Sequence, residues 1–205
     1  MKTLIIAFIA LFSVATYAQS PYEKGMSQGL ALWKSGNTTE AAAQFERIAQ
    51  AEPDNWIPLY YQALIGTTTA FSIRDPEEKL KQIQNAKIIL SKSSQDNNSE
   101  WLTLKAMNLV AELTTDPMTK SKTLAPTIYA LYEKAIQLDP NNPRAVLGLA
   151  EFQIGSKKYF KQDISKECEA VKKALDLFET HKPALPFAPA WGKERAEKIV
   201  QNCGQ

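Results

Sequence analysis

The chain has 205 residues, with 24 basic and 22 acidic side chains and a formal net charge of +2 at neutral pH. This near balance provides no strongly basic surface and argues against a nucleic-acid-binding protein. Only eight residues are glycine, and apolar residues recur at helical spacing in most segments, without the sustained alternation of strands, so the composition and pattern predict an all-α protein.

Residues 1–18 have the pattern of a secretory signal peptide. Met1 and Lys2 precede the apolar run "LIIAFIALFSVA", and "TYAQ" follows it. The run is too short to span a bilayer permanently, and Ala18 precedes a plausible cleavage point. The alternative is a buried first helix. We expect a mature chain of residues 19–205, located in the periplasm or secreted from a bacterium, with no membrane span after signal removal.

The mature chain predicts nine helices joined by short polar segments. Several predicted starts pair a capping side chain with a first-turn proline, as in Ser20-Pro21 and Asp75-Pro76. Such a proline loses no hydrogen bond, because the first helical amides have no partner within the helix. Residues 91–99 are polar and predict a surface loop. The predicted helices lie near 22–35, 38–51, 56–72, 76–92, 100–114, 118–138, 143–155, 162–180 and 190–202.

A spacing of apolar residues recurs along these helices. In the second helix, Ala41, Phe45 and Ile48 precede Pro53 at intervals of 4, 3 and 5 residues, and equivalent sets end at residues 98, 140 and 183. The end-points are separated by 45, 42 and 43 residues. A period in this range indicates stacked helix pairs. The capping-box spacing of Asn37 and Glu40 places a helix start in the same unit.

The first unit resembles a tetratricopeptide repeat (TPR). The resemblance rests on Gly29, Gly36, Ala41, Phe45 and Pro53 within residues 22–55, and "YEKAIQLDPNNPRAVLGLA" resembles a junction between two such repeats. It implies a TPR-like right-handed solenoid of about four helix pairs plus a C-terminal capping helix. The implied units of this single domain are residues 22–55, 56–98, 99–142 and 143–183, with a cap at 184–205.

The C-terminal part predicts a cap held by a disulfide. The sequence "THKPALPFAPAW" carries three prolines between residues 183 and 189, and we expect it to lie extended across the last repeat and to lead to Trp191 and a closing helix. Cys168 and Cys203 are the only cysteines. Export would place them in an oxidising compartment, so we predict that they are bonded. The alternative is two buried free thiols.

The sequence offers little support for catalysis. His181 is the only histidine, and it lies beside the proline-rich segment, where a surface or packing role is expected. Metal-binding, phosphate-loop and nucleophile motifs are absent, so we expect no enzyme activity, no cofactor and no metal site.

Two functions remain open. The first is a non-enzymatic interaction scaffold that binds a protein or peptide through the concave face of the array, as the TPR resemblance implies. The second is an exported module that holds a small ligand, such as a sugar or peptide fragment, with exposed aromatic residues. A clustered aromatic pocket beneath the proline-rich tail would favour the second, and a long open groove of mixed charge the first. By the resemblance, the candidate groove residues are Glu23, Met26, Leu30, Trp33, Lys34, Arg144, Leu147 and Glu151. The alternative for Met26, Leu30 and Trp33 is the core between helices.

Overall fold

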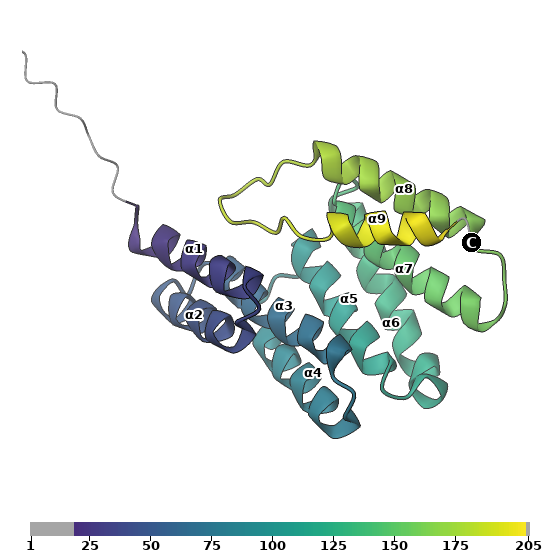
Figure 1. Ribbon diagram of the computed structural model, residues 1–205, viewed down its shortest axis with the longest axis horizontal. Coiled ribbons are helices and arrows are strands. Elements are labelled where there is room, and N and C mark those ends of the chain that lie inside the picture. Colours follow the sequence, from purple (N-terminus) through teal and green to yellow (C-terminus); the bar gives the residue numbers. More distant parts are fainter. Residues whose placement is uncertain (1–18, 204–205) are drawn as a thin grey trace, which may run out of the picture.

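The computed structural model describes residues 19–203, and the proposed signal peptide lies outside the described residues. The described residues form nine α-helices and no strands (Figure 1). The all-helical expectation is therefore confirmed. The helices are α1 (Pro21–Lys34), α2 (Thr38–Ala51), α3 (Trp56–Ser72), α4 (Pro76–Ser91), α5 (Ser99–Leu113), α6 (Pro117–Leu138), α7 (Pro143–Tyr159), α8 (Ser165–Thr180) and α9 (Lys193–Asn202).

Local capping explains why most of these helices begin where they do. The Ser20 hydroxyl accepts a hydrogen bond from the Glu23 amide, and the Glu23 carboxylate accepts one from the Ser20 amide, which forms a complete capping box on α1. Asp75 caps α4 by accepting from the amide of Glu78 at 2.8 Å. These side chains satisfy amides that the first helical turn leaves without partners.

The capping box expected at the start of α2 does not form. Asn37 precedes the helix, but its side chain makes no capping hydrogen bond. Its backbone carbonyl instead accepts from the Ala41 amide as the first bond of the helix. The spacing of Asn37 and Glu40 predicted the start of α2 correctly, but it did not predict whether the Asn37 side chain makes a capping hydrogen bond.

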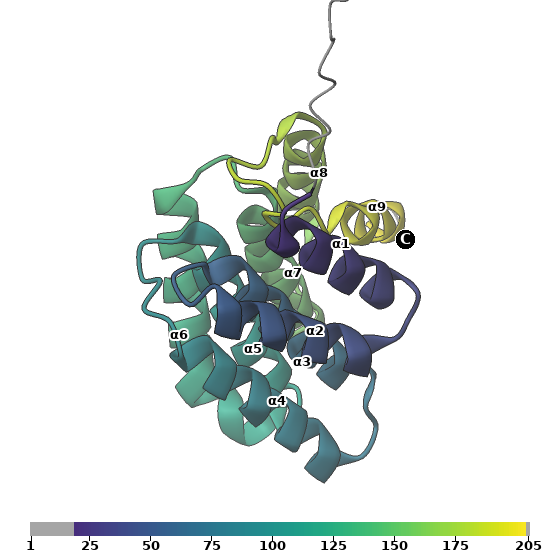
Figure 2. The same cartoon turned by 90° about the vertical axis from the view of Figure 1, so that its left-hand side faces the viewer.

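The first eight helices form four consecutive hairpins, α1–α2, α3–α4, α5–α6 and α7–α8 (Figures 1 and 2). Each hairpin packs against the next one, and the first helices of neighbouring hairpins also touch, α3 against α5 and α5 against α7. Helix α9 returns to pack on α8. The N-terminal ends of α3, α5 and α7 are thereby gathered on one side of the molecule.

Two glycines that face large aromatic side chains let the helices pack close together. A Cβ atom added at Gly29 on α1 would lie 2.8 Å from the ring of Phe45 on α2, and one added at Gly148 on α7 would lie 2.4 Å from the ring of Tyr132 on α6. Both rings are buried. Phe45 also stacks on Tyr61 of the next hairpin, with ring centroids 5.2 Å apart. Aromatic residues thus fill the space between consecutive hairpins.

The segment between α8 and α9, residues 181–192, is called the tail segment below. It reaches further than the sequence analysis predicted (Figure 1). We expected it to lie across the last repeat, but Phe187 packs edge-on against Tyr22 at the start of α1, with ring centroids 5.7 Å apart. The segment also turns at its far end, where the Ala188 amide donates to the Leu185 carbonyl. Phe187 of the tail segment thus packs against the first helix of the chain, a contact that residue spacing in the sequence cannot indicate.

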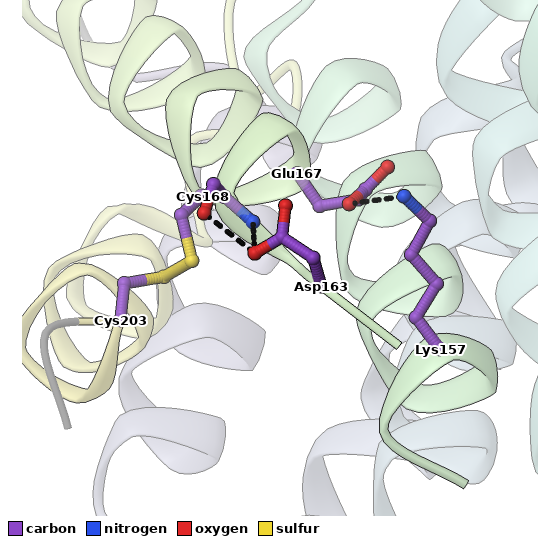
Figure 3. Close-up of a disulfide and its surroundings, with 6 residues drawn as sticks. Lys157, Asp163, Glu167, Cys168 and Cys203 are labelled. Carbon is purple, nitrogen blue, oxygen red and sulfur yellow. Dashed lines mark hydrogen bonds and ion pairs between the residues drawn. A yellow bond between two sulfur atoms is a disulfide. The ribbon is translucent and has the colours of Figure 1, made fainter. Parts of the chain in front are cut away.

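A disulfide between Cys168 and Cys203 joins α8 to the end of α9 (Figure 3). The Cα atoms are 5.8 Å apart, within the range that a disulfide allows. The bond closes a loop that contains the whole tail segment, so both ends of that segment are fixed. Within residues 19–203, no helix has the length and apolar character needed to cross a membrane.

Candidate ligand-binding site

The tail segment covers a floor of aromatic side chains from α1 and α3. The indole Nε1 of Trp191 donates to the hydroxyl of Tyr60 at 3.0 Å. The Tyr61 hydroxyl donates to the carbonyl of Ala188 at 3.5 Å, and Phe187 meets Tyr22. Aromatic residues therefore pack directly against the proline-rich tail, and of the Phe, Tyr and Trp side chains of the described residues only Trp56 lines the cleft reported below, so the clustered aromatic pocket named above as favouring a small ligand is not seen.

Burial keeps the floor tyrosines neutral. Tyr60 is fully buried, and desolvation raises its pKa well above the usual value of 10. Desolvation likewise raises the pKa of Tyr61 to about 12. Both hydroxyl groups therefore stay protonated at physiological pH and act as neutral hydrogen-bonding groups.

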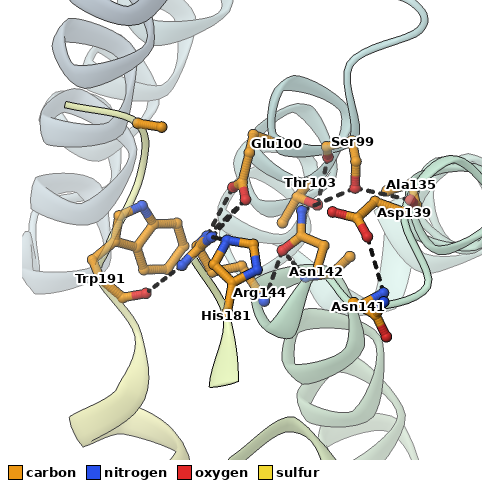
Figure 4. A network of polar contacts seen from close by, with 12 residues as sticks. Ser99, Glu100, Thr103, Ala135, Asp139, Asn141, Asn142, Arg144, His181 and Trp191 are labelled. Atoms are coloured by element: carbon orange, nitrogen blue, oxygen red, sulfur yellow. Dashed lines mark hydrogen bonds and ion pairs between the residues drawn. The ribbon is translucent and has the colours of Figure 1, made fainter. Parts of the chain in front are cut away.

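One buried arginine ties the tail segment to α5 and α7. Arg144 lies in the first turn of α7 with 2% of its surface exposed. Its Nη2 and Nε atoms donate to the Glu100 carboxylate at 2.7 and 2.8 Å, and its Nη1 donates to the Trp191 carbonyl at 3.3 Å (Figure 4). Burial alone would lower the pKa of Arg144, but its hydrogen bonds to the Glu100 carboxylate and the negative charge of that group outweigh burial and raise the pKa. A charge pair of this kind holds three chain segments together.

The capping residue of α7 continues this network into α5 and α6. Asn142 is completely buried, and its side-chain oxygen accepts from the Arg144 amide at 2.9 Å. Its side-chain amide donates to the Ser99 hydroxyl, which donates to the Ala135 carbonyl at 2.8 Å (Figure 4). Asn142 thus caps α7, and the same side chain fixes the start of α5 against the end of α6.

A cleft of about 710 Å³ opens beside this network. A volume of this size lies in the range of small-molecule sites. Apolar side chains from three parts of the chain line it, among them Trp56, Leu138 and Leu185. The polar lining includes Asp96, Asp139, Glu100, His181 and Lys182. The remaining lining residues come from the 94–99 loop and from the tail segment at 183, 184, 188 and 189.

His181 stands at the boundary between this cleft and a smaller one of about 400 Å³. Its Nε2 atom lies 3.0 Å from Nη2 of Arg144 (Figure 4). A guanidinium can only donate, so Nε2 must accept, which assigns a neutral imidazole with its proton on Nδ1. Among the described residues, no group of three or more His, Cys, Asp and Glu side chains is arranged to hold a metal ion.

The residues predicted to line a concave groove fall into two groups. Met26, Arg144 and Leu147 are buried, so they cannot offer their side chains to a partner on an open groove. Met26 belongs to the core between the first hairpins, with Leu30 and Trp33 partly buried against it. This placement agrees with the alternative reading of these apolar residues as core. Arg144 is buried because Glu100 and the tail segment enclose it, and Leu147 packs in the core of the last hairpin.

The remaining predicted residues lie nearer the surface. Glu23 is half-buried and serves the capping box of α1, and Lys34 is exposed. Glu151 on α7 pairs with Arg195 on α9. These residues lie on different parts of the molecule and are not gathered around the cleft.

Sequence reasoning missed Glu100 and Trp56 as site residues. Glu100 sits in the first turn of α5, where an acidic residue is ordinary helix-start chemistry. The proline-rich segment beside the lone histidine was the one available signal, and it was linked to a small-ligand site only through a possible aromatic pocket beneath it.

No family model and no curated protein match the chain. A solved structure does: the HusA haemophore from Porphyromonas gingivalis has a TM-score of 0.77 and 25% sequence identity over 90% of this chain and 93% of that chain. This neighbour is named as a carrier of haem and not as an enzyme. The likeness supports an exported binding protein with an all-helical fold, and the disulfide fits export.

Proposed function

We propose that this protein is a non-enzymatic binding protein, exported to the periplasm or exterior of a bacterium, that holds haem in the cleft beneath the tail segment. The observation that carries the proposal is the cleft of about 710 Å³ with a single histidine at its edge and a lining of both apolar and polar side chains. The name of the structural neighbour supports the choice of haem over other flat ligands. The expected export is tested by N-terminal sequencing of secreted material, which should begin at Gln19.

The cleft offers the groups that haem requires. Histidine is one of the side chains that hold haem iron, and His181 is the only one in the chain. Trp56 and Leu185 provide apolar surface for the porphyrin faces, and the exposed Lys182 can meet a propionate. Asp96 and Asp139 line the same cleft, so the propionates should turn away from them towards solvent.

Binding through His181 requires one local rearrangement. The lone pair of Nε2 faces Arg144 at 3.0 Å, so Nε2 must leave the guanidinium before it can coordinate iron. Arg144 keeps its bonds to Glu100 and to the Trp191 carbonyl. The buried charge therefore stays paired while the imidazole turns into the cleft, and the cost is one hydrogen bond between an arginine and a neutral ring.

A direct test is titration of the mature protein with iron protoporphyrin and, separately, with metal-free protoporphyrin, followed by absorbance. We expect both to bind, and the iron form to show the spectrum of a histidine-ligated haem. His181→Ala should abolish that spectrum, and it should weaken the binding of iron protoporphyrin more than the binding of metal-free protoporphyrin. Lys173→Ala, an exposed substitution on α8, is the control. Equal binding by wild type and His181→Ala would contradict iron coordination, and no binding of either porphyrin would contradict the proposal.

A second candidate is the interaction scaffold implied by the TPR resemblance. It treats residues 19–205 as one TPR-like right-handed solenoid with the unit boundaries given above, and places a peptide along the first helices of the hairpins. The contacts of α3 with α5 and of α5 with α7 support it. The tail segment already occupies the N-terminal ends of these helices, through Tyr22, Tyr60 and Arg144. A peptide would have to displace it, which favours the small-ligand proposal. Under the scaffold proposal, a synthetic 181–192 peptide should compete with the partner.

A further inference from the structure

Three large apolar side chains project together from the end of α7 and the start of α6. Met118, Tyr159 and Phe160 are 76%, 64% and 66% exposed. The Tyr159 hydroxyl donates to the sulfur of Met118 at 3.0 Å, and the rings of Tyr159 and Phe160 meet edge-on at 5.1 Å. We call these three residues the Tyr159 patch. Single exposed apolar residues are ordinary, but a contiguous group indicates an interaction surface.

Basic side chains flank the Tyr159 patch. Lys158 and Lys161 adjoin the two aromatic residues, Lys122 lies one helical turn beyond Met118, and all three are exposed. None of them takes part in an ion pair with another residue of the 19–203 range. The nearby acids, Asp116 and Asp163, accept hydrogen bonds at helix starts from Thr119 and Ser165, and these bonds lower the pKa of both carboxyl groups, so both stay ionised. The three lysines outnumber the two carboxylates, so the surface around the patch carries an excess of positive charge.

The patch is remote from the cleft. Arg144 and the capping Asn142 lie at the N-terminal end of α7, and the patch lies at its C-terminal end, in the lower right of Figure 1. A helix of 17 residues is about 25 Å long. A substitution in the patch can therefore be tested without altering the proposed haem site.

We infer that the Tyr159 patch docks the protein on an anionic lipid surface. Tyr159 and Phe160 enter the headgroup layer, where aromatic rings are favoured. Lys158, Lys161 and Lys122 face the lipid phosphates, and each lysine close to such a surface strengthens binding about fivefold.

Vesicle sedimentation tests this inference with the mature protein. Vesicles of phosphatidylcholine alone are compared with vesicles that also contain phosphatidylglycerol. We expect binding to the anionic vesicles, weakened by salt. The double variant Tyr159→Ser with Phe160→Ser should reduce binding to the anionic vesicles about tenfold or more. The double variant Lys158→Glu with Lys161→Glu should reduce it to a similar extent. The matched control is Lys172→Glu with Lys173→Glu on α8, which makes the same change in net charge at other exposed lysines.

The control should retain binding to within about threefold, because it leaves the three residues of the Tyr159 patch and the three lysines beside it unchanged. Equal binding to both kinds of vesicle, or an equal loss in the control, would overturn the inference. So would a dimer in sedimentation analysis that the Phe160→Ser change dissociates, because the patch would then be occupied by a second copy. All variants should bind iron protoporphyrin as the wild type does, so a failure here is distinct from a failure of the haem proposal.

Discussion

The buried pair of Arg144 and Glu100 makes a sharp prediction about stability. Glu100→Ala would leave a guanidinium that is 2% exposed facing only neutral partners, the Trp191 carbonyl and His181. Removing one member of a buried ion pair costs about 3–5 kcal/mol, because the remaining charge is uncompensated. For a chain of this size the loss corresponds to a fall in melting temperature of roughly 6–20 °C.

Urea unfolding followed by circular dichroism measures this loss of stability. Two further variants show whether the loss comes from the unpaired buried charge. Replacing both partners, Arg144→Met with Glu100→Leu, should bring stability to within about 2 kcal/mol of the wild type, because no charge is left buried. Glu151→Ala breaks the exposed pair with Arg195, whose side chain is 61% exposed, and should cost about 1 kcal/mol or less. A Glu100→Ala loss no larger than the Glu151→Ala loss would refute the reasoning, as would a double variant no better than the single one.

Three other predictions follow from the described contacts. Cys203→Ser opens a loop with a sequence separation of 35 and should remove about 4 kcal/mol of stability, with hydrogen exchange rising first in the tail segment; a rise that is as large in α1 and α2 would contradict this. Phe45→Ala should cost about 3–5 kcal/mol in thermal melts, since the ring is fully buried between hairpins, and unchanged melts would contradict that packing. Stability should fall between pH 10 and pH 12, because burial raises the pKa of Tyr61 from 10 in the unfolded chain to about 12, so its contribution is complete below pH 10 and is lost as the pH rises through the folded pKa. Tyrosinate absorbance and circular dichroism should change together in that titration, and ionisation of every tyrosine with helices intact would contradict the account.

Helix positions were predictable because their signals are local. Proline with a preceding capping residue fixed the starts of α1, α4, α6 and α7 to within one residue. The prediction was least accurate at the junction of α7 and α8, where α7 continues to Tyr159 and α8 begins at Ser165. The turn there uses Lys161 in a left-handed conformation, with φ of 54°. A lysine carries no sequence signal for such a conformation.

The site was much less predictable, because it depends on contacts between distant parts of the chain. Trp191 and Tyr60 are separated by 131 residues, and Arg144 and Glu100 by 44. The TPR resemblance named Met26 and Leu147 as groove candidates, but an apolar stripe on a helix does not by itself distinguish a core face from a binding face. Arg144 was expected on an open face. It is buried because it pairs with Glu100, which belongs to another hairpin, and the sequence gives no sign of that contact.

The central claim is that the cleft beneath the tail segment is the ligand site. The most direct measurement is an amide NMR titration of the isotope-labelled mature protein with gallium protoporphyrin, a diamagnetic substitute for haem. The account predicts shifts concentrated at residues 94–100, 138–139, 181–185 and 188–189, which line the cleft. Shifts confined to the Tyr159 patch or to the α1–α2 hairpin, with residues 181–189 unchanged, would contradict it.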